Sequence, residues 1–118
     1  MIISTTSAAA YSDSGLPGGR GGTGAHYSLT KAALDRFTKA VSLETESMGI
    51  PLINLDPGAT LTERVQIQTA KYGFDMSIFH SMDIPAAAAE YLCTCANPLR
   101  YNGQVVVAAV LCKQFNLV

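Results

Sequence analysis

Three short apolar segments alternate with longer helical patterns along the chain. Residues 1–7 are apolar and rich in β-branched side chains, which predicts a buried strand. Residues 50–55 predict a second strand, and the Asp-Pro-Gly turn at residues 56–58 ends it because proline cannot continue a hydrogen-bonded ladder. Residues 104–111 form a continuous apolar run and predict a third strand.

Helical periodicity fills the segments between these strands. From about residue 25 to residue 48 apolar side chains recur near the 3.6-residue period, and Gly49 stands where a C-terminal cap belongs. Thr60 and Glu63 fit a capping box, with Thr60 as the cap and Glu63 at the third helical position, which predicts a helix to about Lys71. An alanine-rich helix is predicted over residues 83–96. The periodic residues of the longest helix are Leu29, Ala33, Phe37, Ala40, Val41 and Met48.

The order strand, helix, strand, helix, helix, strand predicts an α/β fold. Continuously apolar strands in this order are typical of a parallel sheet that is buried on both faces. The 118 residues suffice for one domain and are too few for two. Three parallel strands alone leave bare edges, so we expect the chain to form part of a larger sheet.

Composition narrows the classes of partner. Only 14% of the residues are charged, the net charge is -1, and Lys and Arg form no cluster, which argues against nucleic acid. So few charged residues cannot coat every face of a free monomer, so we expect an apolar part of its surface to be covered by another part of the protein or by a partner. The longest apolar run, residues 105–112, is far shorter than the roughly 20 residues that span a bilayer. With no signal-like N-terminus visible, we expect a cytoplasmic protein without a membrane segment.

The cysteines indicate neither a disulfide framework nor a metal site. Cys93, Cys95 and Cys112 are odd in number and form no CxxC pair, which predicts buried, reduced thiols. His26 and His80 are the only histidines, so zinc lacks a credible ligand set and no metal is expected.

A phenol and an ammonium group stand four positions apart at the start of the longest predicted helix. Tyr27 and Lys31 therefore share one helix face. A lysine about 5 Å away favours the phenolate by roughly 3 kcal/mol at an effective dielectric constant of about 20. Ser7 ends the first predicted strand, and ligands of parallel sheets sit beyond the carboxyl ends of strands. The serine could hold a carbonyl or alcohol oxygen while the tyrosine gives or takes its proton.

Four segments in this order resemble the classical short-chain dehydrogenases/reductases. Residues 2–7 are similar to the family's strand that ends in the catalytic serine, and residues 27–34 to its YxxxK helix. Residues 56–62 resemble its nicotinamide-contacting stretch, and residues 101–105 its last strand. The resemblance implies that residues 1–118 are the C-terminal half of a Rossmann-like, doubly wound parallel sheet.

The resemblance also implies roles for individual residues. Tyr27 would be the general acid and base, Lys31 would favour the phenolate and bind the nicotinamide ribose, and Ser7 would orient an alcohol or carbonyl substrate. The cofactor would be NAD or NADP, and the complete protein would form a homo-oligomer through the longest helix. The implied cofactor-binding residues are Tyr27, Lys31, Pro57, Gly58, Ala59, Thr60 and Thr62.

The chain also departs from the family's pattern. The family's glycine-rich cofactor turn, adenine-side strands and catalytic asparagine precede the serine strand, so the resemblance covers only the C-terminal half. The interval between Ser7 and Tyr27 is longer than usual, which makes Ser14 the reserve candidate for the serine. Residues 108–112 replace the family's common Asp-Gly-Gly ending.

Two further alternatives remain open at this stage. Six of the ten residues 15–24 are glycine, and residues 19–24 match GxGxxG, but residues 8–18 separate them from the preceding strand, which favours a flexible loop beside the substrate. The main functional hypothesis, which rests on the family resemblance, is an NAD(P)-dependent oxidoreductase. Residues 63–82 resemble by position the family's substrate lid, and their many apolar side chains predict a hydrophobic substrate. The alternative is a non-catalytic chain that needs a partner and binds no cofactor alone.

Overall fold

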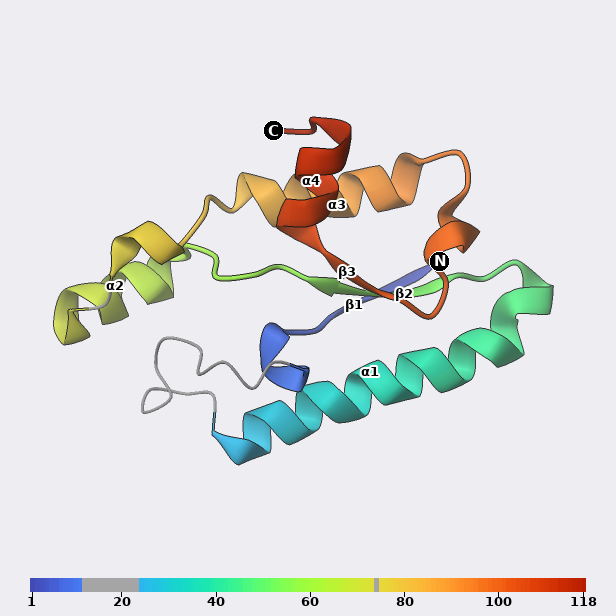
Figure 1. Ribbon diagram of the computed structural model, residues 1–118, viewed down its shortest axis with the longest axis horizontal. Helices are drawn as coiled ribbons and strands as arrows, with labels where there is room; N and C mark the ends of the chain where they lie inside the picture. Colours follow the sequence, from blue (N-terminus) through green and yellow to red (C-terminus); the bar gives the residue numbers. More distant parts are fainter. Residues whose placement is uncertain (12–23, 74) are drawn as a thin grey trace.

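The predicted α/β fold with a parallel sheet is confirmed. A computed structural model describes residues 1–11, 24–73 and 75–118. Within this part of the chain, three strands alternate with four α-helices (Figure 1), an architecture compatible with part of a Rossmann-like fold. The elements are β1 (Ile2–Thr5), α1 (Ala25–Thr45), β2 (Leu52–Asp56), α2 (Glu63–Tyr72), α3 (Asp83–Thr94), β3 (Val105–Val107) and α4 (Ala108–Phe115). Short 3-10 helices cover Ala8–Ala10, Glu46–Met48, Met76–Ile78 and Pro98–Tyr101.

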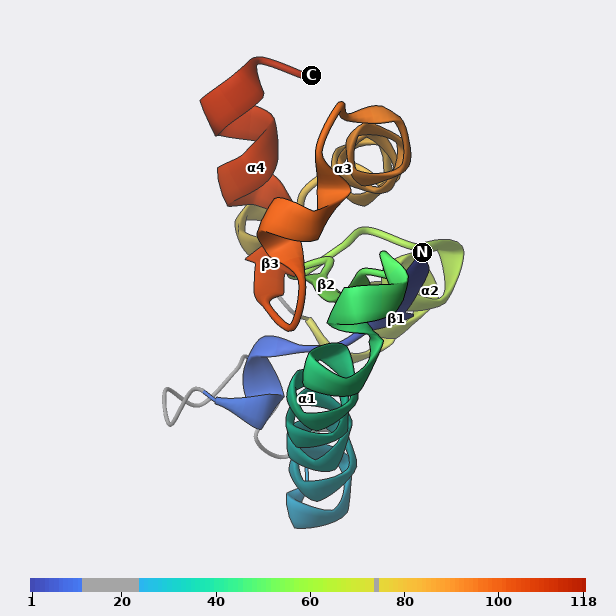
Figure 2. The same cartoon turned by 90° about the vertical axis from the view of Figure 1, so that its right-hand side faces the viewer.

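The sheet is a single layer between two layers of helices. β2 lies in the middle and pairs in parallel with β1, Ile2 opposite Leu52, and with β3, Asn54 opposite Val105. α1 covers one face, while α3 and α4 lie on the other (Figure 2). All five residues of β2 are buried, whereas β1 and β3 are partly exposed. The prediction of strands buried on both faces therefore holds for β2 alone, because the other two are edges of this sheet.

The face toward α3 and α4 carries the hydrocarbon core. Ile53 and Leu55 of β2 contribute to it, as does Leu92 of α3, which is fully buried. Full burial of one such aliphatic side chain contributes about 1.5 to 3 kcal/mol. The buried members of the cluster are Ile53, Leu55, Ala88, Leu92, Tyr101, Val106, Ala108, Leu111 and Cys112.

The face toward α1 is held by hydrogen bonds between polar side chains. The buried residues of α1 are Thr38 and Ser42. Thr38 Oγ1 donates to Asn54 Oδ1 of β2 at 2.9 Å, and Asn54 Nδ2 donates to Asp35 Oδ1 at 2.7 Å. By contrast Leu29 and Phe37, two of the residues whose spacing predicts the helix, are 69% and 61% exposed. The apolar periodicity thus identifies α1 correctly, but the apolar side chains lie largely on the outer face of the helix.

The predicted helix caps are partly confirmed. Gly49 adopts the left-handed conformation, with φ of 67°, and its N–H donates to Glu46 O, as a C-terminal cap should. The capping box at Thr60 is wrong, because the cap of α2 is Thr62, whose side-chain oxygen accepts from Val65 N at 3.3 Å. Glu63 is consequently the first residue of α2.

The predicted third strand is wrong beyond Val107. The chain passes directly from β3 into α4, which begins at Ala108. A continuous apolar run does not by itself distinguish a strand from a buried helix, and alanines are strong helix formers. Packing against α3 favours the helix here: the Phe115 ring stacks on Tyr91 with centroids 4.5 Å apart, and Cys112 Sγ donates to Ile84 O at 3.3 Å.

The three cysteines are free thiols in different surroundings. Cys112 is buried, and this burial raises the pKa of its thiol. Cys93 is exposed, so the expectation of buried thiols is wrong for this residue, which lies on the outer side of α3. Among the described helices, none has the length and apolar character needed to cross a bilayer.

Candidate active site

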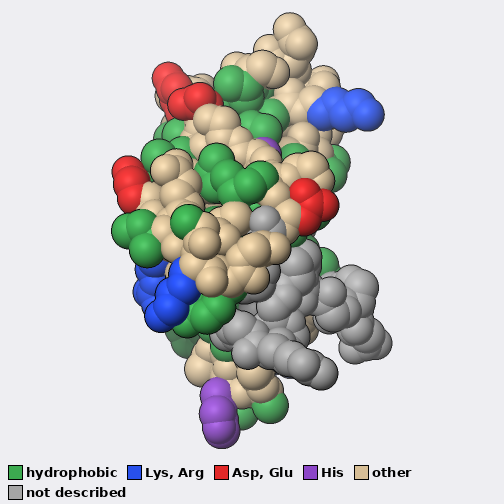
Figure 3. All heavy atoms as spheres, turned by 90° about the vertical axis from the view of Figure 1, so that its left-hand side faces the viewer, with side chains coloured by type: hydrophobic (Ala, Val, Ile, Leu, Met, Phe, Trp, Pro, Cys, Tyr) green, Lys and Arg blue, Asp and Glu red, His purple; other side chains and the backbone are tan. Residues whose placement is uncertain are grey.

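The predicted site residues come from elements that lie toward the same end of the molecule (Figure 1). The carboxyl ends of β1 and β2, the start of α1 and the whole of α2 lie toward the left in Figure 1. Seen from this end, hydrophobic side chains gather near the middle of the surface and charged ones are scattered around them (Figure 3). Such an end of a parallel sheet is where α/β proteins bind ligands.

Tyr27 and Lys31 lie one helical turn apart at the start of α1. Lys31 Nζ is 5.7 Å from the centroid of the Tyr27 ring, and it donates a hydrogen bond of 2.7 Å to Thr5 O at the end of β1. Tyr27 is 39% exposed, so an external molecule can reach it. The hydrogen bond therefore anchors the ammonium group, and with it the start of α1, to the carboxyl end of β1.

Ser7 follows β1 and caps the 3-10 helix Ala8–Ala10. Its Oγ accepts a hydrogen bond of 3.3 Å from Ala9 N, which leaves its hydroxyl hydrogen available as a donor. Between described residues, no hydrogen bond joins Ser7 Oγ to Tyr27 or Lys31. The reserve serine, Ser14, and residues 19–23 of the GxGxxG motif lie outside the described residues.

The segment 57–62 forms one wall of an open pocket of about 520 Å³. Gly58 has a φ of 72°, a left-handed conformation that favours glycine. The hydroxyl of Thr60 donates to Pro57 O at 3.2 Å, so it braces the turn from within. The residues around the pocket are Pro57, Gly58, Ala59, Thr60, Thr62, Val65, Phe79, Met82 and Pro85.

Sequence reasoning missed a tyrosine and carboxylate pair beside this segment. The Tyr11 hydroxyl donates to Asp56 Oδ2, and Asp56 Oδ1 accepts from Gly58 N at 2.9 Å. Asp56 is only 3% exposed. Partial burial, followed by the hydrogen bond to this carboxylate, raises the pKa of Tyr11. Asp56 before Pro57 was visible as a turn residue, but its pairing with Tyr11 depends on the fold.

His80 is a second residue that the sequence left without a role. Its Nε2 donates to Pro57 O at 2.6 Å, so the ring lies against the turn that follows β2. A lone histidine in a mixed apolar stretch carries no signal of such a contact.

Comparison with known proteins finds likenesses among solved structures. No family model matches the chain, and no curated protein matches it. The chain is similar to a solved structure named "Putative oxidoreductase from Escherichia coli str. K-12". The two share 25% sequence identity, and the match has a TM-score of 0.67 over 90% of this chain. The chain spans 39% of the length of that protein, so the likeness concerns part of a larger fold.

Proposed function

We propose that this chain is the catalytic half of an NAD(P)-dependent oxidoreductase of the short-chain dehydrogenase/reductase type, which interconverts an alcohol and a carbonyl compound. The observation that carries the proposal is the Tyr27 and Lys31 pair, anchored to Thr5 O beside Ser7. The name of the similar E. coli structure agrees with an oxidoreductase in general terms.

The three side chains have complementary chemical tasks in this proposal. During reduction the Tyr27 hydroxyl would give its proton to the substrate's carbonyl oxygen, and during oxidation the phenolate would take the alcohol proton. Lys31 would stabilise that phenolate by its positive charge, since its Nζ lies 5.7 Å from the ring centroid. Ser7 would donate its free hydroxyl hydrogen to the same substrate oxygen, while Ala9 N–H orients its Oγ.

The described residues fit the nicotinamide end of a dinucleotide. The pocket beside the segment 57–62 is open and lined largely by apolar side chains, as a flat ring requires. Gly58, Ala59 and Thr60 of the turn after β2 are among the residues that line this pocket. The nicotinamide would supply or accept the hydride. We assign none of the described residues to the adenosine end.

Replacement of Tyr27 by phenylalanine tests the proposed chemistry. The protein would be assayed with NADH and NADPH against a panel of apolar aldehydes and ketones, and nucleotide oxidation would be followed by absorbance. We expect Tyr27→Phe to lower turnover by at least about a hundredfold, because a positioned general acid contributes about 10² to 10⁴. Tyr91→Phe is the matched control, since Tyr91 lies on α3 and stacks on Phe115 of α4, on the face of the sheet opposite α1. Equal activity of the Tyr27→Phe variant and the wild type would refute the assignment.

A second candidate function is that of a non-catalytic chain that needs a partner to complete the sheet. In the described part of the chain β1 pairs with β2 alone, and Ile2 is 52% exposed at its open edge. Such an edge accepts a further strand. The two functions differ in nucleotide affinity, because the alternative predicts that the chain alone binds neither NADH nor NADPH. Equilibrium titration with both nucleotides separates them.

A further inference from the structure

We propose that His80 is a positioning residue: its side chain holds the segment 57–62 in one conformation against the residues that follow the 3-10 helix Met76–Ile78. The role of this segment in binding a nucleotide rests on the proposed function, whereas the conformational role of His80 does not. No part of the sequence pattern assigns a task to this histidine.

Backbone and side chain of His80 both contact the segment. His80 N donates to Ala59 O at 2.9 Å, and Leu61 N donates to His80 O at 2.9 Å. These bonds form an isolated parallel bridge between Thr60 and His80. The ring adds a hydrogen bond of 2.6 Å from Nε2 to Pro57 O, and Thr60 Oγ1 lies 3.4 Å from the same nitrogen. One residue thus contacts both ends of the turn.

The ring of His80 also fills the space beside Gly58. A Cβ atom at Gly58 would lie 2.5 Å from His80 Cε1, closer than side chains approach one another. The histidine ring therefore packs directly against the left-handed turn at Gly58. This contact ties the glycine to a partner 22 positions further along the chain.

The position of His80 links the two walls of the pocket. The segment 57–62 supplies one wall, and Phe79 and Met82 on either side of His80 contribute to the other. A ring that joins the walls keeps them at a set separation before any ligand arrives. Ligand affinity gains from such order, because a loop that is already ordered loses less entropy on binding.

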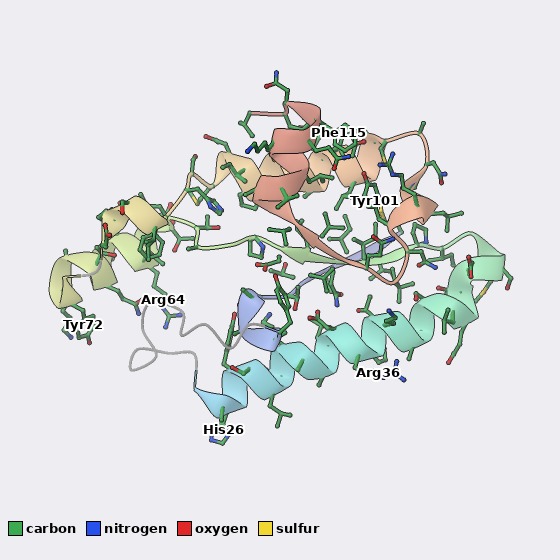
Figure 4. All side chains as sticks on the ribbon, in the orientation of Figure 1. His26, Arg36, Arg64, Tyr72, Tyr101 and Phe115 are labelled. Atoms are coloured by element: carbon green, nitrogen blue, oxygen red, sulfur yellow. The ribbon has the colours of Figure 1, made fainter. Side chains whose placement is uncertain are left out.

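Amide exchange in the ligand-free chain tests the conformational role directly. We expect His80→Ala to raise the exchange rate of the Leu61 amide about tenfold, since the side-chain bond to Pro57 O is lost. His80→Gln should restore slow exchange, because the glutamine Nε2 can donate from nearly the same place. His26→Gln is the matched control, as His26 projects from the start of α1 away from the sheet (Figure 4). Unchanged exchange in a folded His80→Ala variant would overturn the proposal.

A double-mutant cycle provides a second test that does not depend on exchange measurements. Gly58→Ala should destabilise the wild-type chain strongly, through both the contact with the ring and the positive φ. In a His80→Ala background only the strain of the positive φ remains, so the same substitution should shift the unfolding midpoint less. Equal shifts in both backgrounds would show that the ring does not pack on Gly58 and would contradict the proposal.

Nucleotide titration then connects the positioning role of His80 to the proposed function. With NADH or NADPH as the probe, we expect His80→Ala to weaken binding about tenfold and His80→Gln to bind like the wild type. Turnover at saturating nucleotide should be the same in all three. Unaltered affinity in the His80→Ala variant would refute the positioning role toward the nucleotide. If the wild-type chain binds neither nucleotide, the proposed function fails, while the exchange and cycle experiments still decide the conformational role of His80.

Discussion

The two faces of the sheet are built from different kinds of contact. Toward α3 and α4, Ile53 and Leu55 pack in hydrocarbon around the fully buried Leu92. Toward α1, the intervening Asn54 of the same strand binds Thr38 and Asp35 through hydrogen bonds. Alternate residues of one strand therefore serve two unlike interfaces, since successive side chains of a strand point to opposite faces.

The difference matters because the two kinds of contact constrain geometry differently. Apolar packing is proportional to buried area and has little direction, so it provides most of the free energy of folding. Hydrogen bonds require a defined distance and angle. The bonds from Asn54 to α1 therefore fix how the helix lies along β2, and with it where Tyr27 and Lys31 lie relative to the end of β1. We infer that the apolar face toward α3 and α4 provides most of the stability, and that the polar face toward α1 sets the position of this helix.

The largest effect is expected on the apolar face. Leu92→Ala would remove a side chain with no exposed surface and leave a cavity, so the free energy of unfolding should fall by about 2 to 5 kcal/mol. Leu43→Ala makes the same change at a residue of α1 that is 73% exposed, and should cost less than about 0.5 kcal/mol beyond propensity effects. Urea denaturation measures both. Similar losses of stability in the two variants would contradict the view that the apolar face provides most of the stability.

A smaller effect is expected on the polar face. Thr38→Val keeps the shape of the side chain but leaves Asn54 Oδ1 without its donor, which should cost about 1 to 3 kcal/mol. The same denaturation series measures this loss. Amide exchange at the start of α1 should rise together with it, because the helix is then less firmly placed. A variant as stable as the wild type would mean that the polar face does not depend on directed bonds.

The smallest effect concerns Tyr11 and is confined to a range of pH. Because the pKa of Tyr11 is raised in the folded chain, its contribution is fully present below the ordinary tyrosine pKa of about 10 and is lost as the pH rises above that value. Tyr11→Phe should therefore lower the free energy of unfolding by about 1 kcal/mol near neutral pH, and by less at alkaline pH.

Stability measurements across this range test the contact between Tyr11 and Asp56. The difference between the wild type and Tyr11→Phe should stay constant up to about pH 9 and shrink above about pH 10. A difference that is the same at every pH would indicate that the hydroxyl does not donate to the carboxylate. The polar face would then end at Asn54 and not extend to the candidate site.

Most of the secondary structure could be predicted from local sequence signals, whereas the contacts across the candidate site depend on tertiary structure. The glycine cap at Gly49 and the strand before Pro57 follow from short stretches of sequence, and both are present. The run after Val107 failed as a strand because hydrocarbon character alone does not choose between strand and helix. Tyr27 and Lys31 were predictable because one helical turn brings them together.

The remaining site contacts could not be predicted, because they join distant parts of the chain. Tyr11 meets Asp56 and His80 meets Pro57 only after the strands have paired. Neither residue type at these positions is unusual enough to signal a partner. The predicted NAD or NADP cofactor, the cytoplasmic location and the homo-oligomer remain predictions of the sequence.

The central place of β2 also governs the order of events during folding. Both ladders of the sheet join residues about fifty positions apart, as with Ile2 and Leu52 or Asn54 and Val105. β1 and α1 precede β2 in the chain, so the ladder between β1 and β2 can form only after β2 has been synthesised. Chains dominated by such distant pairings fold slowly, because the entropy cost of closing the loop comes before the contacts can stabilise it. The ladder between β1 and β2 therefore cannot form before the whole of α1 has been made.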